Sequence, residues 1–472
     1  MINKLTRNRL ILSIITLAIF LSFIFYANGE TEPIHLVILH SNDTHGNLIA
    51  YDKINQIGGI AKTATLIKQI KGENKDNTLV LHAGDELSRG DDLTACFGGE
   101  VNMRAMEMMG YDAFTPGNGD FYFGIQNLIK QTSLVKFPIL HANVVYKDTN
   151  KRIFQPYAIK EISGIKIGIL GLGVIREDHP SSRNLKLLDP INVAKEIIPE
   201  LQEKSDIIIA LTHIGVGADV LLAEKVPQID IIVGGHTHTK LDKPMMVPRK
   251  NGKGEVITVQ AGEYTQFLGK LDIYLEKKNS DHYKIVKSEG RLIPIDKNVK
   301  EDETIATFLK QYSEKLSQVV YTFKTDIASP GTSDSPMGKF LAEAIKIKTN
   351  SDVSLLDLGS AQSSAIAGDI TLNSIYKIHP WRNRVLLYEL TGEQLQKVLA
   401  EKDLYAFGCS YQRSSGVISE LKIGDIPINL TKAYKVAIDE FLSYSTKSLY
   451  NVPYLEAEGT IDSIFLKYLS SF

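Results

Sequence analysis

The stretch IHLVILHSNDTH, residues 34–45, joins an apolar run to a polar end, and this junction decides the fold of the chain. Residues 34–39 are mostly Ile, Leu and Val, as expected of a strand that is buried on both faces. The run leads into Asn42, Asp43 and His45, which are typical of a loop that follows a strand. We therefore expect a strand of a covered sheet, with chemically useful side chains at its carboxyl end.

Four more apolar runs repeat this pattern further along the chain. We expect buried strands at residues 78–81, 165–171, 206–211 and 229–233, and closing strands within residues 255–276. Helical patterns lie between them at residues 59–70, 101–109 and 192–204. Because strands alternate with helices, the sequence predicts a layered α/β domain, which we place at residues 33–295.

A second α/β unit is expected after this domain. The polar stretch 296–304 leads into a helix-like run at 305–319, and we interpret residues 296–320 as a linker helix. In residues 321–472 the pattern predicts helices at 336–347 and 392–400 and strands at 353–358 and 384–389. The sequence thus divides into two folded parts.

Composition excludes several classes of protein. The 472 residues include 53 Lys+Arg and 55 Asp+Glu, a net charge of −2, with 43% hydrophobic and 23% charged residues. These values exclude a disordered or collagen-like chain, and the absence of excess positive charge argues against a nucleic-acid partner. Cys96 and Cys409 are too few for a disulfide scaffold or a zinc–thiolate site, although one long-range bridge stays possible.

The N-terminus predicts export. Lys4, Arg7 and Arg9 precede an unbroken apolar stretch at residues 10–27, and small residues follow at 27–29. This pattern indicates a signal peptide at residues 1–29, with an uncleaved N-terminal anchor as the alternative. In both cases we expect a periplasmic or extracellular protein that meets a membrane only through this segment.

Potential metal ligands follow the predicted strands. They are Asp43, His45, Asp85, Asn118, His213, His236 and His238. In open α/β sheets, ligands bind beyond the carboxyl ends of the strands, so these side chains are expected to meet. Alone, each is typical of a turn or a cap, but a mixed set of carboxylate, imidazole and amide groups favours a divalent ion such as Zn, Mn or Fe.

The ordered motifs resemble those of the calcineurin-like metallophosphoesterases, and within them the 5'-nucleotidase family. The carrying motifs are Asp43-Thr44-His45, Gly84-Asp85, Gly117-Asn118, Thr212-His213 and Gly235-His236-Thr237-His238. The resemblance covers nearly all of the chain after residue 29. It implies a metallophosphoesterase β-sandwich flanked by helices, followed by a smaller α/β domain of the 5'-nucleotidase C-terminal type.

The resemblance also implies a centre of two divalent metal ions. The implied ligands are Asp43, His45 and His238 for one ion, Asn118, His213 and His236 for the other, and Asp85 for both. Two cations about 3.5–4 Å apart hold a phosphate ester and lower the pKa of a shared water. The metal-bound hydroxide would then attack phosphorus in line while the cations stabilise the growing charge.

This chain departs from the family next to Asn118. Members usually carry a His directly after this Asn and an Asp three residues further on, where this chain has Gly119 and Tyr122. Loss of such an acid typically lowers the rate by about 10²–10⁴. Three explanations stay open: a weakened enzyme, a substrate with a good leaving group, or another side chain in the space beside Gly119.

Three side chains are candidates for that space, and we expect at least one of them to reach the substrate. Asp120 is the nearest in sequence, and His82 and His141 each lie at the end of a predicted strand. A buried, hydrogen-bonded histidine is the alternative interpretation for His82 and His141.

The second unit resembles the substrate-specificity domain of the family. Where nucleotidases usually have an Arg that grips the phosphate side of the substrate, this chain has Gln362, which lacks the charged fork. Phe441 matches a base-stacking ring, and Lys447 replaces an Asp that holds ribose. Arg382 and Lys447 could supply charge to an anionic substrate, although exposed surface positions are the ordinary alternative for them, as core packing is for Phe441.

Three functional hypotheses follow. The leading one is an exported two-metal phosphoesterase that acts on a nucleotide or another small anionic ester. The second is a hydrolase of thiosulfate-type sulfur esters, because a related branch of the superfamily also ends in Gly-His-Thr-His. The third is a binding protein with little catalytic activity.

Overall fold

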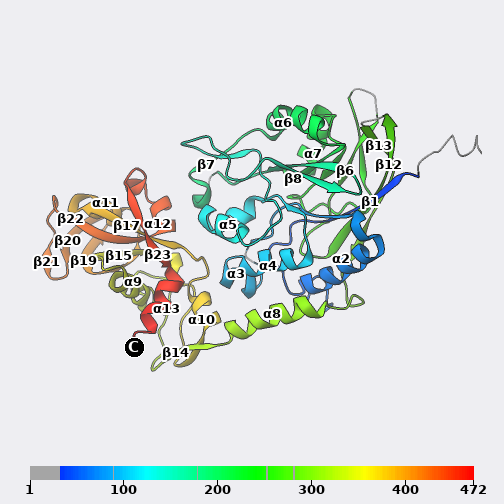
Figure 1. Ribbon diagram of the computed structural model, residues 1–472. Helices are drawn as coiled ribbons and strands as arrows, with labels where there is room; N and C mark the ends of the chain where they lie inside the picture. Colours follow the sequence, from blue (N-terminus) through cyan, green and yellow to red (C-terminus); the bar gives the residue numbers. More distant parts are fainter. Residues whose placement is uncertain (1–31, 89, 178, 251–253, 280–281) are drawn as a thin grey trace, which may run out of the picture.

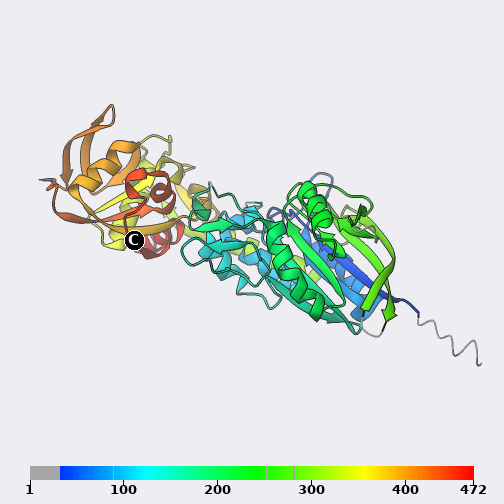
Figure 2. The same ribbon diagram turned by 90° about the horizontal axis from the view of Figure 1, so that it is seen from above.

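The computed structural model describes residues 32–472 except 89, 178, 251–253 and 280–281, and it consists of two units joined along the chain (Figure 1). Seen from above, the two units lie end to end and give the molecule an elongated shape (Figure 2). The expected signal or anchor segment, residues 1–29, lies outside the described residues. Within the described part of the chain, no helix has the length and apolarity that a membrane crossing requires.

The first sheet has the strand order β13-β12-β1-β2-β3. Its strands are β1 (Ile34–Ser41), β2 (Thr78–His82), β3 (Ala113–Phe114), β12 (Phe267–Asn279) and β13 (His282–Pro294). Strands β1, β2 and β3 run parallel, whereas β12 pairs antiparallel with β1. The parallel strands therefore end at one edge, which is where the polar motifs begin.

The second sheet has the strand order β10-β11-β9-β8-β6-β5. Its strands are β5 (Tyr157–Ile162), β6 (Ile165–Gly173), β8 (Ile207–His213), β9 (Ile231–Val233), β10 (Met245–Pro248) and β11 (Glu255–Val259). Strands β6, β8, β9 and β11 are parallel neighbours. A short pair, β4 (Val144–Tyr146) and β7 (Leu185–Leu187), lies beside the sheets.

The two sheets pack face to face as a sandwich, and this explains why the strands read as unbroken apolar runs. In β1, Leu36 and Ile38 belong to the core between the sheets, whereas Val37 and Leu39 face the helices on the outer side. In β8, Ile209 faces the inner core and Ile208 the outer one. Because successive residues of a strand point to opposite faces, both faces must be apolar when both are covered.

Helices cover both outer faces of the sandwich. One side carries α2 (Ile60–Asn74), α3 (Asp92–Phe97), α4 (Glu100–Met109), α5 (Ile125–Thr132) and α8 (Glu303–Leu316), and the other carries α6 (Pro190–Lys204) and α7 (Val216–Lys225). The predicted α/β fold with a helix-flanked sandwich is thereby confirmed.

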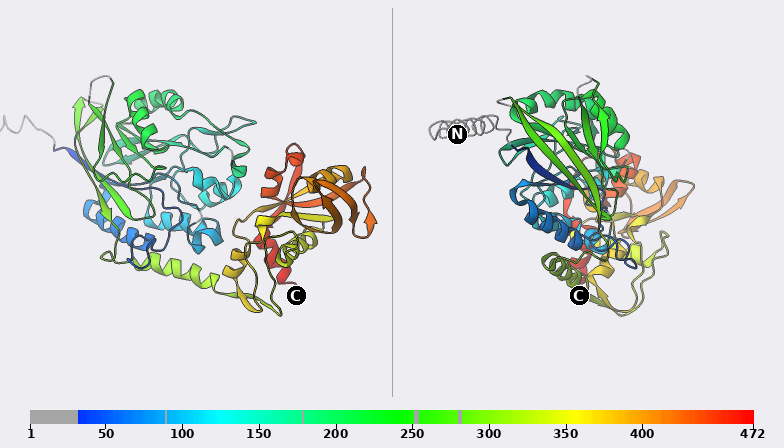
Figure 3. Two further views of the ribbon diagram at one scale, coloured as in Figure 1. Left: turned by 180° about the vertical axis from the view of Figure 1, so that it is seen from behind. Right: turned by 90° about the vertical axis from the view of Figure 1, so that its right-hand side faces the viewer.

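The connecting helix α8 is packed rather than free. Its apolar residues Ile305, Leu309, Tyr312 and Leu316 are buried in the core that underlies the first sheet. The helix ends at Leu316, three residues before the predicted end, because Val319 begins β14 (Val319–Phe323). Figure 3 shows α8 lying along the first unit and leading to the base of the second.

The second unit is a smaller α/β fold around a sheet of order β18-β15-β22-β17-β23. These strands are β15 (Val353–Asp357), β17 (Arg384–Thr391), β18 (Leu404–Phe407), β22 (Ala433–Asp439) and β23 (Tyr454–Thr460). Its helices are α9 (Pro336–Thr349), α10 (Leu372–Ile378), α11 (Gly392–Glu401), α12 (Glu440–Ser445) and α13 (Ile461–Leu469). Shorter strands complete it: β16 (Gly368–Thr371) beside β14, and β19 (Cys409–Ser414), β20 (Val417–Ile423) and β21 (Ile426–Pro427) as a ribbon. Cys96 and Cys409 are both free, so the possible long-range bridge is not formed.

Candidate metal centre

The predicted ligands are brought together at the carboxyl edge of the sandwich. Asp43 and His45 follow β1, Asp85 follows β2, and Asn118 begins a short 3-10 helix after β3. His213 is the last residue of β8, and His236 and His238 follow β9. Both sheets thus contribute to one site, which agrees with the rule that ligands bind beyond the ends of parallel strands.

Five of these residues have a left-handed backbone, which non-glycine residues seldom adopt. The φ angles are 50° at Asp43, 48° at His45, 56° at Asp85, 80° at His236 and 54° at His238. Such a conformation raises the energy of the folded state, by about 1–3 kcal/mol for each strained residue. Hydrogen bonds between the loops hold it in place, from Asp43 N–H to the Gly84 carbonyl (2.9 Å) and from His45 N–H to the Asp85 carbonyl (2.8 Å). This concentration of strain is typical of a functional site.

Glycine is required where the loops approach the ligands most closely. A Cβ atom on Gly117 would lie 2.4 Å from Asp85 Oδ1 and 2.5 Å from the His213 ring. Gly84, which precedes Asp85, has a positive φ of 90°. The Gly-Asp and Gly-Asn motifs therefore reflect a lack of space as much as backbone freedom.

The ligand atoms converge in two overlapping groups. In the first, His238 Nε2 lies 3.3 Å from Asp43 Oδ1 and 2.9 Å from His45 Nε2. In the second, His213 Nε2 lies 3.4 Å from Asp85 Oδ1 and 3.9 Å from Asp43 Oδ1. Each group could hold a metal ion, and Asp43 belongs to both.

Asn118 and His236 lie beside these groups. The neighbouring Gly119 N–H donates to Asp85 Oδ1 at 2.6 Å, which places Asn118 directly next to the second group. His236 is exposed, and the centre of its ring is 5.2 Å from that of His213. Of the seven predicted ligands, His236 is therefore the one whose ring is least enclosed.

The atoms that face the centre fit a cation. Asp43 Oδ1, Asn118 Oδ1 and His213 Nε2 are buried and have no hydrogen-bond partner among the described residues. Buried polar atoms are nearly always partnered in folded proteins, so three such atoms without a partner are consistent with a candidate cation site. Oxygen and imidazole nitrogen atoms together suit a borderline divalent metal.

The histidines are oriented by contacts on their other ring nitrogen. Nδ1 of His213 donates to the Ala83 carbonyl at 2.7 Å, and Nδ1 of His45 is 3.1 Å from Ser88 Oγ. Nδ1 of His238 pairs with the Glu263 carboxylate. Such contacts fix the tautomer and turn Nε2 towards the metal, as is usual around metal-bound histidine.

The buried carboxylates and histidines of the centre shift one another's pKa values. Burial alone would lower the pKa of His213, but the carboxylates of Asp85 and Asp43 outweigh it and raise this pKa to about 10. Burial alone would raise the pKa of Asp85, but His213 and His45 outweigh it and lower this pKa to about 2. A divalent cation would replace the proton on His213, since metal binding to histidine releases protons.

The three predicted catalytic candidates are all buried. Asp120 accepts hydrogen bonds from the backbone N–H groups of Asp85 (2.8 Å), Glu86 (2.9 Å), Leu87 (2.6 Å) and Gly117 (2.7 Å). His82 lies between the Gly84 N–H (3.2 Å) and the Glu86 carboxylate (3.0 Å). His141 is enclosed near Phe121, and burial lowers its pKa to about 3. The structure thus places these side chains inside the fold, where Asp120 shapes the loop that carries Asp85.

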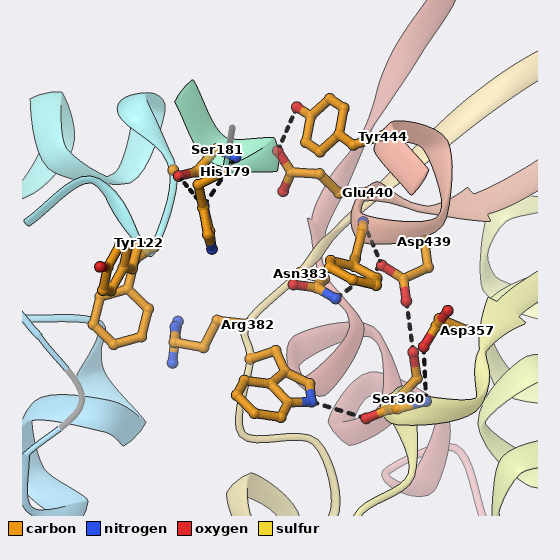
Figure 4. A pocket seen from close by; sticks show the side chains of 15 residues that line it. Tyr122, His179, Ser181, Asp357, Ser360, Arg382, Asn383, Asp439, Glu440 and Tyr444 are labelled. Carbon is orange, nitrogen blue, oxygen red and sulfur yellow. Dashed lines mark hydrogen bonds between the residues drawn. The ribbon is translucent and has the colours of Figure 1, made fainter. Parts of the chain in front are cut away.

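A cavity of about 300 Å³ lies between the two units (Figure 4). Tyr122 and His179 line it from the first unit, and Trp381, Arg382 and Phe441 line it from the second. Phe441 is 41% exposed, so its ring is available to a ligand. The interpretation of Phe441 as a core residue is therefore wrong.

The other predicted substrate residues differ in their placement. Arg382 lines the cavity, but its guanidinium also donates to the Cys96 carbonyl of the first unit and lies 3.7 Å from the Asp462 carboxylate. Gln362 is exposed and bonds the Gly359 carbonyl at 2.8 Å, and Lys447 is exposed on the surface. Neither Gln362 nor Lys447 is among the described residues that line this cavity.

Trp381 and His179 are among the residues of the cavity wall that sequence reasoning missed. Trp381 donates its indole N–H to the Gly359 carbonyl at 2.8 Å, which fixes the ring at the wall. It is the only Trp of the chain and stands next to Arg382, which could have drawn attention to it. For His179 there was no signal, because it lies in an irregular loop far from the motifs in sequence.

Comparisons with known proteins agree with this geometry. Residues 36–240 match the calcineurin-like phosphoesterase family, and residues 315–452 match the 5'-nucleotidase C-terminal domain. The trifunctional nucleotide phosphoesterase YfkN of Bacillus subtilis is 29% identical over 86% of this chain, and the chain spans about a third (32%) of the length of YfkN. A 5'-nucleotidase of Vibrio cholerae is 28% identical over 86% of this chain and 84% of its own.

Solved structures share the fold across both units. A 5'-nucleotidase precursor of Thermus thermophilus superimposes with a TM-score of 0.55 at 23% identity and covers 93% of this chain and 96% of its own. The sulfate thiohydrolase SoxB of Thermus thermophilus gives a TM-score of 0.53 at 19% identity, covering 92% and 94%.

Fold, site and comparisons together define a calcineurin-like phosphoesterase, a class of metal-dependent hydrolases. Within this class, the chain belongs to the 5'-nucleotidase family, whose members carry the characteristic C-terminal domain.

Replacing Asp85 by Asn should reduce metal binding. The amide cannot balance the charge of a cation as the buried carboxylate does, so we expect less than half of the divalent metal bound by the unmodified protein. Elemental analysis after dialysis against a limiting chelator measures this. Asp272→Asn is the matched control, since Asp272 also contacts a histidine (His35, 2.8 Å) but lies on β12 outside the metal groups. Equal metal content in both variants would contradict the assignment.

Asp219 is a buried carboxyl group close behind the site. It accepts a hydrogen bond from Thr212 Oγ1 at 2.7 Å, and a Cβ atom on Gly234 would lie 2.4 Å from its other oxygen. Burial raises the pKa of Asp219 to about 7. A raised pKa means that the folded state holds the proton more tightly than the unfolded state does.

The stability of the protein should therefore depend on Asp219. Because its pKa is raised, Asp219 stabilises the folded state fully below about pH 4. This stabilisation is lost as the pH rises through about 7. Asp219→Asn is neutral at every pH. Its melting temperature, relative to that of the unmodified protein, should therefore be higher at pH 8 than at pH 5. Calorimetry at both pH values measures the difference. A difference that is the same at both would show that Asp219 stays charged in the folded protein.

Proposed function

We propose that the chain is a phosphomonoesterase of the 5'-nucleotidase type that acts on a nucleotide with two divalent metal ions. The observation that carries this proposal is the set of unpartnered buried atoms, Asp43 Oδ1, Asn118 Oδ1 and His213 Nε2, next to a cavity lined by aromatic rings. The site offers cations for a phosphate group, and the cavity offers Trp381 and Phe441 for a base.

The two ions would share the seven predicted ligands. Asp43, His45 and His238 would hold one ion, Asn118, His213 and His236 the other, and Asp85 would contact both. When bound, such ions neutralise phosphate charge and activate water. The overlap of both metal groups at Asp43, and the distance from Asp85 to His213, support a paired rather than a single site.

The protein's own groups would position the ester. Asp120 holds the Asp85 loop through four backbone N–H groups, which would keep Asp85 and Asn118 in register. Arg382 brings positive charge into the cavity, although Asp462 balances part of it. Gln362 carries no charge. Within the second unit, Arg382 is therefore the residue of this cavity that could bring a positive charge to an anionic substrate.

The reaction would run without the His–Asp dyad usual in this family. At Gly119 a Cβ atom would lie 2.1 Å from Ser88 Oγ, so a side chain at this position has no room unless Ser88 moves. His82, Asp120 and His141 are buried, and their reach to the substrate stays a prediction. Residues 1–29 would direct the protein out of the cytoplasm, as a cleaved signal or as an anchor.

Sulfur-ester hydrolysis is the second candidate function. The fold is shared with a sulfate thiohydrolase as well as with nucleotidases, so the fold alone separates neither activity. The aromatic rings of the cavity favour the nucleotide, because stacking on a base is a contact that a small inorganic sulfur ester cannot make.

A substrate panel on the metal-loaded protein tests the proposed function. We expect phosphate release from nucleoside 5'-monophosphates and p-nitrophenyl phosphate with Mn, Zn, Co or Mg, because two cations activate water towards phosphorus. Asp85→Ala should lower kcat by at least about 10³, since the shared ligand is lost. Sulfate release from a thiosulfate ester without phosphate release would favour the second candidate. No turnover in any combination would reject both.

Replacing Phe441 should separate nucleotides from simple esters. Loss of a stacking ring typically costs about 1–3 kcal/mol per base, so Phe441→Ala should raise KM for a nucleoside monophosphate roughly 5- to 150-fold. KM for β-glycerophosphate, which has no ring, should stay within about twofold. Phe472→Ala serves as the control, because Phe472 is an exposed ring at the C-terminus. A uniform change for both substrates would argue against base stacking.

A further inference from the structure

Tyr122 stands at the junction between the metal ligands and the cavity. Its phenol oxygen lies 3.1 Å from the side-chain nitrogen of Asn118, and its ring lines the cavity between the units. The ring is half-buried, and the Asn118 amide nitrogen is its neighbour on the side of the metal centre. A substrate that spans the metal centre and the cavity has to pass this phenol group.

The hydrogen bond with Asn118 has a fixed direction. The amide N–H₂ can only donate, so the phenol oxygen of Tyr122 accepts. The other end of the amide, Asn118 Oδ1, is buried without a partner among the described residues. The one proton of Tyr122 is therefore available to a different acceptor.

The ring of Tyr122 is held at the cavity wall by its neighbours. The ring of His179 packs against that of Tyr122, with centres 4.9 Å apart and a tilt of 35°. His179 is held in turn by Ser181, whose Oγ is 2.7 Å from its Nδ1. Figure 4 shows Tyr122 and His179 on the wall of the first unit, facing Arg382 on the wall of the second.

We propose that Tyr122 donates a hydrogen bond to the ester oxygen of the substrate and so takes over part of the role of the missing dyad. This inference rests on the proposed function. The phosphate would lie at the metal centre and the leaving group in the cavity, so the oxygen that joins them would lie beside the phenol. The position of the Tyr122 phenol group and its available proton thus both indicate the ester oxygen as the acceptor.

The reaction balances with Tyr122 unchanged. The bond between phosphorus and the ester oxygen breaks, and the hydroxyl part of water binds to phosphorus. The remaining proton of water goes to the leaving oxygen. Tyr122 keeps its own proton and stabilises the charge that grows on the leaving oxygen as the bond breaks. A donor of this kind matters most for poor leaving groups, on which the most charge accumulates.

Tyr122→Phe tests the inference because it removes only the hydroxyl group. We expect kcat/KM for p-nitrophenyl phosphate, which has a good leaving group, to stay within about threefold of the unmodified protein. For phenyl phosphate and nucleoside 5'-monophosphates it should fall about 10- to 100-fold. Tyr157→Phe is the control, since the Tyr157 hydroxyl bonds Glu200 at 2.6 Å on the surface of the first unit. Metal content, measured on each variant, should be equal.

A binding measurement gives a second readout. In benzylphosphonate a CH₂ group replaces the ester oxygen, and it accepts no hydrogen bond. Tyr122→Phe should therefore bind this inhibitor as tightly as the unmodified protein does, as measured by calorimetry with metal present. Affinity weakened fivefold or more would place the hydroxyl on another oxygen and overturn the inference.

The results also separate this inference from the proposed function. If the unmodified protein hydrolyses these esters but Tyr122→Phe lowers the rate equally for good and poor leaving groups, or not at all, only the role of Tyr122 is rejected. If the unmodified protein hydrolyses none of them with any metal, the proposed function is rejected and the inference falls with it.

Discussion

The carboxylate of Asp120 is the contact on which the rest of the site depends. It is fully buried and binds four backbone N–H groups, three from the loop after β2 and one from the turn before Asn118. These N–H groups would otherwise be buried without partners, which costs free energy for each of them. One side chain thus holds two loops together, and these loops supply Asp85 and Asn118. The surrounding hydrogen bonds offset the strain in the backbone of the neighbouring ligands.

Much of the fold and the ligand set could be predicted from the sequence. Strands such as β1 and β8 are covered on both faces, so their sequences are continuously apolar and easily recognised. Their polar ends meet because parallel strands end at the same edge, and this rule needs no knowledge of side-chain positions. Asp43, His45, Asp85, His213 and His238 were identified in this way, and they converge.

The rest could not be predicted because it depends on contacts between distant segments. Nothing in the sequence indicates that Asp120 points into the fold, that Ser88 fills the space beside Gly119, or that His179 packs on Tyr122. The cavity is formed by both units, so no local pattern describes it. For the same reason the ends of α8 and the placement of Gln362 and Lys447 away from the cavity required the structure.

The left-handed backbone at five ligand positions has a consequence for how such a protein evolves. A glycine at Asp43 or His238 would relieve the strain in the main chain but remove a metal ligand. At these positions a substitution that raises thermal stability would therefore lower activity. Selection for stability alone would favour loss of the metal ligands while the β-sandwich is kept. Descendants that keep the architecture and have lost the chemistry are thus an expected outcome of this design.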